Sequence, residues 1–497
     1  MLNDIPKQFI SNGNVLSGSL EIAEGFNDFF VNIGPNLASE IPNSNKHFTE
    51  YLNEPCNENF VFANINHEII LNALRKLKSK NSCGPDKIST SLMKFIAPSI
   101  LDPLSHLFNL SFKTGFIPTC LKTAVIKPIY KKGDSDSFTN YRPISLLSPF
   151  SKLLEKVACN QIMRYLDKFK LLYKHQYGFR RGHSTEHPVI HLLDIIYKAL
   201  DNPDGSKYTL AIFIDLTKAF DTCETEILLH KLSNYGFRGV ANTWFRNYLT
   251  GRKQYTSVRG ENSSLKNILC GVPQGSILGP LLFILLINDL PNASNFFSLL
   301  YADDTTLEMS SNDLVKLYIE AKIELDKIAD WFRANKLTLN ISKTKYILFR
   351  DKSQQVDFTN LKLKIQNEDI DRIGEFGKRY GLNPEISQKN GVFIIDELNG
   401  SFGFSNDVLN KVITIKYVSD GLGTDNEMQI HKLAEDAIYK YITHALASGR
   451  SNFPEYIINR FRKERRAAMR NAKLRLSNLK LGELTQVMRG KAKHIKH

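Results

Sequence analysis

The tetrapeptide Tyr301-Ala302-Asp303-Asp304 constrains this chain most strongly, and it follows the apolar run Phe296–Leu300. A run of β-forming residues broken by two acidic residues predicts a strand that enters a tight hairpin turn. Adjacent carboxylates repel each other, and holding them near apolar residues is costly unless cations lie between them. Such a pair is typical of a two-metal site for phosphoryl transfer. An Asp-Asp pair alone is also ordinary turn chemistry, so a third carboxylate on a second strand decides between the interpretations.

A third carboxylate does follow a second predicted strand. The run Tyr208–Ile214 is almost continuously apolar, as expected of a strand covered on both faces, and Asp215 comes directly after it. Together with Asp303 and Asp304, it gives three carboxylates at two strand ends, which can hold two Mg²⁺ ions about 4 Å apart. Mn²⁺ is the alternative ion. The pattern predicts activation of a 3′-hydroxyl by one ion and neutralisation of a leaving pyrophosphate by the other.

Residues around Asp215 are candidates for further roles at the same site. The backbone carbonyl of Phe213 or Leu216 can add a ligand to the metal ions. Phe220 lies five residues after Asp215, where an aromatic ring can press on an incoming sugar and exclude a 2′-hydroxyl. The plainer alternative makes Phe220 a core residue and Asp221 a helix cap.

Length and composition exclude several classes of protein. A chain of 497 residues is long enough for roughly three domains, and 42% apolar with 23% charged residues is ordinary for a globular protein. The longest apolar stretch, Ile277–Ile287, is interrupted by Gly279 and Pro280 and is too short to cross a bilayer, so no membrane partner is expected. The six cysteines lack the spacing of a zinc or redox site, which favours an intracellular protein, in either the nucleus or the cytoplasm.

The net charge of +14 is unevenly distributed along the chain. Between Arg460 and His497 there are thirteen Lys or Arg residues and two Glu residues, which gives +11 and leaves about +3 for the first 459 residues. A basic tail favours a polyanionic partner, although such a run is also typical of a solvated helix face. The rest of the chain is therefore expected to bind nucleic acid through local patches.

Hydrophobic periodicity predicts an α+β organisation with strands and helices in alternation. A strand is expected at Thr123–Tyr130, followed by a basic hairpin-like loop at Lys131–Asp134. Around the two acidic strand ends the order of elements fits a ferredoxin-like fold. Helices are expected at Ile22–Ile33, His67–Lys80, Leu92–Phe112 (with breaks at Pro98 and Pro103), Ser151–Phe169, His187–Leu200, Glu224–Leu249 (with a break near Gly236), Ile277–Leu290 and Leu314–Asn335.

Further stretches occur in a fixed order around the Asp215 strand and the Tyr-Ala-Asp-Asp turn. They are Ser82–Asp86, Ile126–Asp134, Asn140–Leu147, Gln176–Thr185, Gly271–Ser276 and Leu337–Thr344, preceded by Glu21–Phe30. In this order, the stretch from residue 15 to residue 372 resembles the reverse transcriptases of non-LTR (LINE-type) retrotransposons. The resemblance implies an RNA-directed DNA polymerase whose partners are an RNA template, a DNA primer and dNTPs.

The resemblance also implies a right-hand polymerase fold with fingers and a ferredoxin-like palm. An N-terminal extension is expected at residues 1–66, the fingers and the start of the palm at 67–200, and the catalytic palm at 201–350. Residues 351–375 are then a linker or junction. Residues 376–497 are an unassigned region, because the helical thumb of the family does not follow and is missing or replaced.

Basic residues beside the predicted hairpin are candidates for holding a triphosphate. Lys127, Lys131, Lys132 and Arg142 are expected on or near a fingers-type hairpin, where cations grip phosphates as the leaving group departs. Taken one at a time, each is better explained as a surface charge, whereas as a cluster beside a polymerase site they favour phosphate contact. Lys343, placed like the lysine of the family, is expected to protonate the departing pyrophosphate.

The remaining candidates are expected to touch nucleic acid. Gln274 is a candidate nucleotide-binding residue that can hydrogen-bond the template or primer strand, and Gly275 lets the backbone approach a base pair. An ordinary strand-to-helix turn explains both equally. Arg180 and Arg181 are either template-backbone contacts or solvent-facing charges. Tyr301 either packs under the acidic turn or contacts the primer.

Beyond the junction the sequence changes character. A small β unit is expected at Gly391–Lys416, an amphipathic helix at Glu427–Ala447 and a long basic helix at Ile457–Met488. The basic helix either replaces the thumb as a duplex clamp or is an unrelated nucleic-acid-binding or assembly segment. An endonuclease like that of LINE-type polyproteins is not apparent, so the primer nick is expected from elsewhere.

Three functions are open at this point. The first is the polymerase, with Asp215, Asp303 and Asp304 as its metal ligands. The second is an inactive, thumb-less remnant that only binds nucleic acid. The third is a chimeric chain whose C-terminal region is a structural or assembly component.

Overall fold

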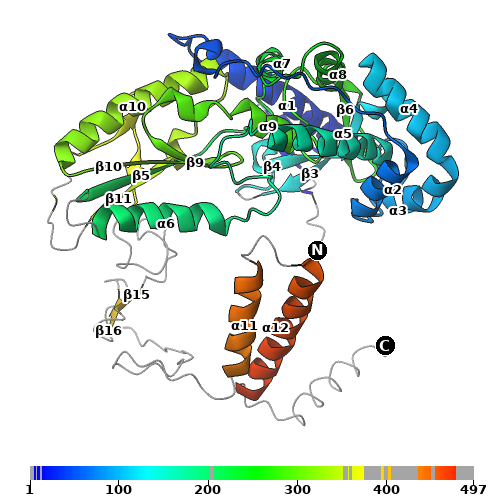
Figure 1. Cartoon of the computed structure of the whole chain (residues 1–497). Coiled ribbons are helices and arrows are strands. Elements are labelled where there is room, and N and C mark those ends of the chain that lie inside the picture. Colours follow the sequence, from blue (N-terminus) through cyan, green and yellow to red (C-terminus); the bar gives the residue numbers. More distant parts are fainter. Residues whose placement is uncertain are drawn as a thin grey trace. The chain divides into compact units, whose positions relative to one another are not determined.

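The computed structural model describes residues 5–6, 8–11, 14–131, 133–201, 206–350, 356, 361–373, 393–396, 401–404, 435–448 and 454–476. The chain divides into two compact units, Met1–Gly374 and Glu375–His497, and each is described by itself. The first unit is a mixed α/β structure with two larger sheets (Figure 1). It also has two small hairpins, of β1 (Phe9–Ser11) with β2 (Asn14–Leu16) and of β12 (Lys364–Ile365) with β13 (Glu368–Asp369). Every residue expected at the site belongs to this unit.

The first sheet carries the acidic residues. Its strands β5, β9, β10 and β11 are antiparallel neighbours in the order β11-β5-β10-β9, which is the order of a β-α-β-β-α-β unit. The strands are β5 (Tyr208–Ile214), β9 (Phe297–Tyr301), β10 (Asp304–Ser311) and β11 (Lys345–Arg350), with the short β14 (Asp371–Arg372) beside β11. Both expected strands, at 208–214 and 296–300, are therefore confirmed, the second with a shift of one residue.

Helices cover both faces of this sheet, α10 (Leu314–Ala334) on one and α6 (Glu186–Asp201) on the other (Figure 1). Successive side chains of β5 lie alternately on the two faces of the sheet. Leu210 and Ile212 belong to the main core of the unit, whereas Ala211 packs with Leu192 of α6. This two-sided burial is the reason that β5 is apolar at almost every position.

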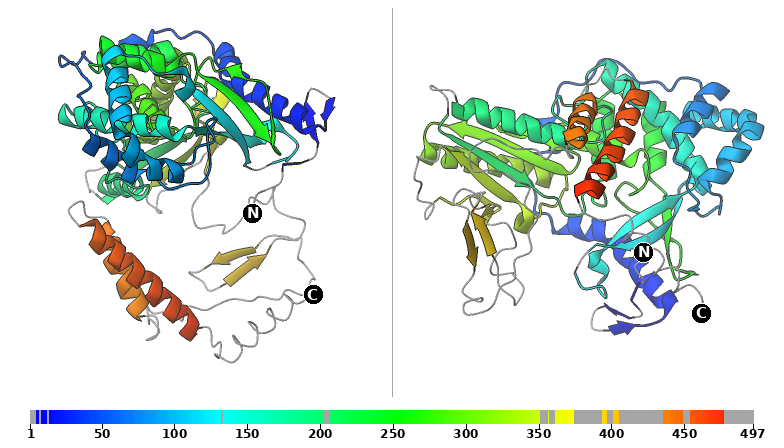
Figure 2. Two further views of the ribbon diagram at one scale, coloured as in Figure 1. Left: turned by 90° about the vertical axis from the view of Figure 1, so that its right-hand side faces the viewer. Right: turned by 90° about the horizontal axis from the view of Figure 1, so that it is seen from below.

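A second sheet has the strand order β4-β3-β6-β7, with β8 beside β6. Its strands are β3 (Thr123–Tyr130), β4 (Tyr141–Leu147), β6 (Lys253–Val258), β7 (Glu261–Asn262) and β8 (Lys266–Asn267). The hairpin of β3 and β4 confirms the expected strand and the basic loop after it. Helix α1 (Ser19–Glu40) lies beside this sheet (Figure 2). Phe26 of α1 packs edge-on against Phe138 in their shared core.

The other helices of the first unit follow the predicted periodicity, with some differences at their ends. They are α2 (His67–Lys76), α3 (Thr90–Ile96), α4 (Leu101–Thr114), α5 (Pro149–Lys168), α7 (Thr225–Asn234), α8 (Val240–Leu249) and α9 (Gly279–Leu286). The expected break at Pro103 is wrong, because Pro103 lies in the first turn of α4. The backbone N–H groups of a first turn have no hydrogen-bond acceptor within the helix, so a proline there removes no helical hydrogen bond. Helix α9 begins at Gly279 rather than at Ile277.

The second unit contains a hairpin and a pair of helices. Strands β15 (Phe393–Asp396) and β16 (Ser401–Phe404) pair antiparallel, and helices α11 (Glu435–Ser448) and α12 (Glu455–Leu476) pack together. The remainder of the expected β unit, and the expected helical residues 427–434 and 477–488, lie outside the described residues. Within the described part of the chain, no helix combines the length and apolar character that crossing a membrane requires.

Candidate active site

Strand pairing brings the three acidic residues together. Thr305 of β10 pairs with Ile214 of the antiparallel strand β5. The residues one position further towards this edge of the sheet are Asp304 and Asp215, and they therefore lie opposite each other. The turn between β9 and β10 places Asp303 beside them. All three acids line one cavity of about 740 Å³. The two-strand arrangement expected from the sequence is therefore present at this edge.

The segment that directly precedes β11, residues 340–344, holds Asp215 in place. The backbone carbonyl of Asp215 accepts a hydrogen bond from Asn340 N at 2.9 Å, and its N–H donates to Thr344 Oγ1 at 3.4 Å. Lys343 lies between these two anchors, and its Nζ is 3.4 Å from Asp215 Oδ2. The lysine expected to act as a general acid thus borders the same cavity as the acids.

Burial opposes the charge of the two turn residues. It raises the pKa of Asp303 above its ordinary value, and the Asp215 charge adds to this rise. It also raises the pKa of Asp304, with further rises from the charges of Asp303 and Asp215. Arg142 and Lys131 act in the opposite direction on Asp303. A cation among these groups would relieve the repulsion that the pKa values record.

The donor set fits a divalent cation, although the acids do not form a closed cluster. Among the described residues, no group of three His, Cys, Asp or Glu side chains has the geometry of a ready-made metal site. One oxygen of Asp215 is instead close to the Lys343 ammonium. Carboxylate oxygens are nevertheless the ligands that hard divalent cations prefer, and Leu216, a candidate carbonyl ligand, also lines the cavity. Phe213 is not among the lining residues.

A buried glutamine that the sequence analysis did not single out holds the acidic turn. Gln176 is fully buried, and its Oε1 accepts hydrogen bonds from Ala302 N at 3.2 Å and from Gly178 N at 2.8 Å. Ala302 has a φ of +57°, a left-handed conformation that an L-residue rarely adopts without support. Gly178 approaches so closely that a Cβ there would lie 2.2 Å from Ala302 N. The only signal in the sequence was the position of this pair inside the stretch Gln176–Thr185.

The expected phosphate-binding cations are not all at the cavity. Lys131 and Arg142, from the loop between β3 and β4 and from β4 itself, line it. Lys127 does not: its Nζ donates to Ser257 Oγ at 2.9 Å and to the Ser257 carbonyl at 3.3 Å, and burial lowers its pKa. Lys127 therefore ties β3 to β6 in this structure. Lys132 lies outside the described residues.

Phe220 packs against the core and also borders the cavity. It lines the cavity, and its ring packs against Phe283 of α9 with a centroid distance of 4.8 Å. Phe179 lies edge-on to it at 6.4 Å. The ring is thus held by the core while it faces the space beside the acids. Its contact with a sugar stays a prediction.

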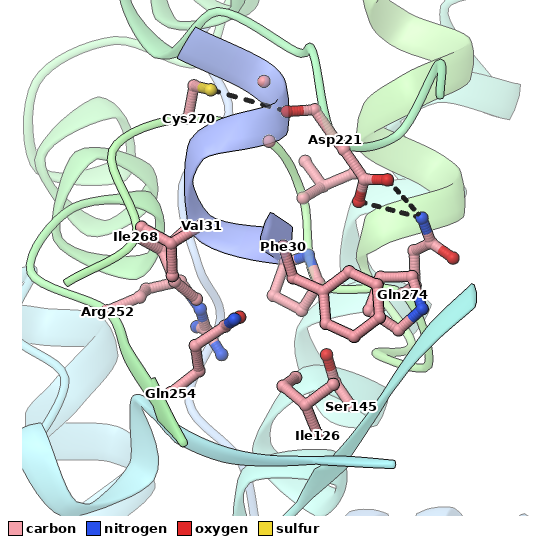
Figure 3. A pocket seen from close by; sticks show the side chains of 15 residues that line it. Phe30, Val31, Ile126, Ser145, Asp221, Arg252, Gln254, Ile268, Cys270 and Gln274 are labelled. Carbon is pink, nitrogen blue, oxygen red and sulfur yellow. Dashed lines mark hydrogen bonds between the residues drawn. The ribbon is translucent and has the colours of Figure 1, made fainter. Parts of the chain in front are cut away.

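Gln274 and Gly275 are explained in part by contacts within the protein. Gln274 lines the cavity, but its Nε2 donates to both oxygens of Asp221 at 2.8 Å (Figure 3). Gly275 has a φ of +114°, and a Cβ there would lie 2.9 Å from the Ser145 carbonyl oxygen. Ser145 N in turn donates to the Gln274 carbonyl at 2.8 Å. Close approach of β4 is therefore sufficient to require this glycine.

The three other candidates for nucleic-acid contact have different surroundings. Arg180 Nη1 donates to the carbonyl of Gln176 at 3.3 Å and to that of Tyr173 at 3.4 Å, so its guanidinium supports the local backbone. Arg181 is exposed, and Tyr301 is half-buried at the end of β9. Their roles with a template or primer stay predictions.

Comparison with known families gives a direct match to this region. Residues 129–363 match the family described as "Reverse transcriptase (RNA-dependent DNA polymerase)". The match includes both acidic strand ends and Lys343. Members of this family use divalent metal ions, which agrees with the oxygen-rich donor set of the cavity.

Proteins of several mobile elements are similar to the chain. The "RNA-directed DNA polymerase from mobile element jockey" of Drosophila melanogaster is 28% identical over 313 residues, which cover 61% of this chain and 34% of that protein. The "Probable RNA-directed DNA polymerase from transposon BS" of the same organism is 34% identical over 286 residues, covering 56% and 31%. The chain thus spans about a third of the length of these relatives. Residues 129–363 therefore form a reverse transcriptase domain of the kind found in non-LTR retrotransposons.

Proposed function

We propose that the protein is an RNA-directed DNA polymerase that extends the 3′-hydroxyl of a DNA primer on an RNA template with dNTPs. The observation that carries this proposal is the meeting of Asp215, Asp303 and Asp304 in one cavity that Lys131 and Arg142 also line. Carboxylates for cations on one side and fixed cations for phosphates on the other suit nucleotidyl transfer. The family match of the same residues supports it.

In this proposal the two sheets are the palm and the fingers of a right-hand polymerase. The order β11-β5-β10-β9 is that of a ferredoxin-like palm, with the acids at one edge. The β3–β4 hairpin, which brings Arg142 to the cavity, takes the place of the fingers. A triphosphate would then lie between the two sheets, because the lining residues come from both.

The proposed cofactor is a pair of Mg²⁺ ions, with Mn²⁺ as a substitute, held by Asp215, Asp303 and Asp304. Bound ions would lower the pKa of the primer hydroxyl and neutralise charge on the leaving pyrophosphate. The chain's own residues do the rest. Arg142 and Lys131 orient the phosphates, and Lys343 Nζ holds a proton for the leaving group.

Primer extension on poly(rA)/oligo(dT) with Mg²⁺ tests the proposal. The full-length chain is expected to extend the primer, and Asp303→Ala to lose at least about a thousandfold in rate, because a ligand of the ions is removed. Asp194→Ala is the matched control, since Asp194 is an exposed acid of α6 paired only with Lys198. Duplex binding without extension by the parent protein would instead support the nucleic-acid-binding remnant.

A further inference from the structure

The helix pair of the second unit brings an aromatic ring and a guanidinium group together. Helices α11 and α12 pack side by side, with Ala447 and Ala468 buried (Figure 1). The guanidinium of Arg465 on α12 lies over the ring of Tyr441 on α11, 5.5 Å from the ring centroid. Its Nη1 also donates to Nδ1 of His444 at 3.4 Å. The contact therefore joins side chains of two helices and fixes the place of the guanidinium.

Positive charge gathers at this contact. Arg462 lies three residues before Arg465 on α12. Burial, together with the charges of both guanidinium groups, lowers the pKa of His444. Among the described residues, no carboxylate lies within 4 Å of either guanidinium, and the nearby Glu464 accepts hydrogen bonds from two other cations. Because like charges repel at such distances, a bound polyanion would stabilise the cluster.

The ring of Tyr441 also keeps an open face. The residue is 53% exposed, although the guanidinium covers one side of its ring. Exposed aromatic rings beside cations are typical of proteins that bind single strands, because a base stacks on the ring while its phosphate meets a cation. The bases of a duplex are already stacked on both faces and paired. A ring of this kind therefore favours single-stranded segments, whose bases are free to leave the stack.

We propose that the helix pair carries a binding site for single-stranded nucleic acid, formed by Tyr441, His444, Arg462 and Arg465. A base stacks on the open face of Tyr441, and the two guanidinium groups hold the adjacent phosphates. Because an arginine only donates hydrogen bonds, His444 Nδ1 accepts from Arg465 and orients its guanidinium without adding a charge. The site lies in the second unit, so the inference does not rest on the proposed polymerase function.

The test compares the Kd of the full-length chain for oligo(rU), for oligo(dU) and for an oligo(rU)–oligo(dA) duplex, by fluorescence anisotropy without dNTPs. Tyr441→Leu removes the ring and is expected to weaken binding of both single strands about tenfold, the value of one stacked base, and to leave the duplex Kd unchanged. Tyr441→Phe keeps the ring and is expected to bind all three like the parent. A loss confined to oligo(rU) would narrow the ligand to RNA.

Tyr197→Leu is the matched control, because Tyr197 of α6 is a tyrosine of similar exposure, 61%, in the first unit. Its affinities are expected to equal those of the parent. Photo-crosslinking locates the strand, since the first unit is also expected to bind nucleic acid. Oligo(rU) that carries 5-iodouridine is expected to attach at Tyr441, as mapped by mass spectrometry of the peptides.

Three results would overturn the inference. Equal single-strand affinities of Tyr441→Leu and the parent would show that no base stacks on this ring. An equal loss for the duplex and the single strands would show that the ring supports the helix pair instead. Crosslinks confined to the first unit would place the strand elsewhere. A parent that binds oligo(rU) through Tyr441 but does not extend a primer would reject the polymerase proposal and leave this inference intact.

Discussion

At the scale of single residues, the first unit keeps several carboxylates where burial opposes their charge. Burial raises the pKa of Asp303, of Asp304 and of Asp221, but the three have different partners. The charge of Asp215 adds to the rise in the pKa of Asp303 and of Asp304, whereas both oxygens of Asp221 accept hydrogen bonds from the neutral amide of Gln274. A bound cation would offset the cost of burying the charges of Asp303 and Asp304. No such ion is expected at Asp221, so its buried charge lowers the stability of the folded chain.

Asp221→Asn is therefore expected to stabilise the protein at neutral pH. Burial raises the pKa of Asp221 from 3.8 to about 6. Between these values the folded chain holds a proton that the unfolded chain has released, so the free energy of unfolding falls as pH rises through this window. Two pKa units correspond to about 3 kcal/mol. Urea denaturation measures the free energy of unfolding of the variant and its parent near pH 4 and near pH 7. The variant is expected to be more stable than its parent by up to that amount at pH 7 and by much less at pH 4. An equal difference at both pH values would contradict the raised pKa of Asp221.

A second prediction at this scale concerns Lys343. Replacing it by Gln removes the proton that its Nζ would give to the leaving group, and kcat is expected to fall about a hundredfold with little change in the KM for dNTP. Lys345→Gln is the control, because Lys345 lies two residues away and bonds to Asp371 instead. Single-turnover extension rates distinguish the two, and equal losses would assign Lys343 a structural role only.

At the scale of elements, the β9–β10 turn depends on a neighbour that comes much earlier in the chain. Gln176 lies 126 residues before Ala302, and it pairs with the strand end while its side chain holds the turn. The turn conformation is therefore supported by the loop that precedes α6. Strand pairing alone would leave the left-handed Ala302 without this hydrogen bond.

Gly178→Ala is expected to displace the acidic turn. The added Cβ would lie 2.2 Å from Ala302 N, which forces one backbone to move. A shift of about 1 Å at reacting groups costs on the order of a hundredfold in rate. Primer-extension kcat measures this loss. Gly260→Asn is the control, since nothing lies within 4 Å of a Cβ there and Asn tolerates its positive φ. Full activity of Gly178→Ala would show that the turn is set by β9 and β10 alone.

At the scale of the whole molecule, charge is concentrated in the second unit. Glu464 of α12 is bonded to Lys440 and to Arg460, both at 2.9 Å, whereas Arg462, Lys463 and Arg466 are exposed. Exposed cations at this spacing share one side of a helix. The second unit thus has exposed cations that could contact phosphates in addition to Lys131 and Arg142 of the first unit.

Replacing Arg462, Lys463 and Arg466 by Gln is expected to weaken duplex binding and to make it less dependent on salt. Each lost phosphate contact lowers the slope of log affinity against log salt by about 0.7 to 0.9. Fluorescence anisotropy with an RNA–DNA duplex between low and moderate salt measures the slope. Lys316→Gln is the control, because this lysine of α10 pairs with Glu320. An unchanged slope would make the basic face of α12 a solvated surface.

The sequence by itself determined most local elements and which three acids meet at the cavity. Strands β3 and β5 begin and end where the apolar pattern placed them, and α10 ends one residue early, because periodicity depends on neighbours in the chain. Only the tertiary structure decided that Lys127 bonds to β6, that Gly275 meets β4 and that Asp221 holds Gln274. These contacts join segments tens to more than a hundred residues apart, and no periodic pattern in a single sequence records which distant side chains will meet.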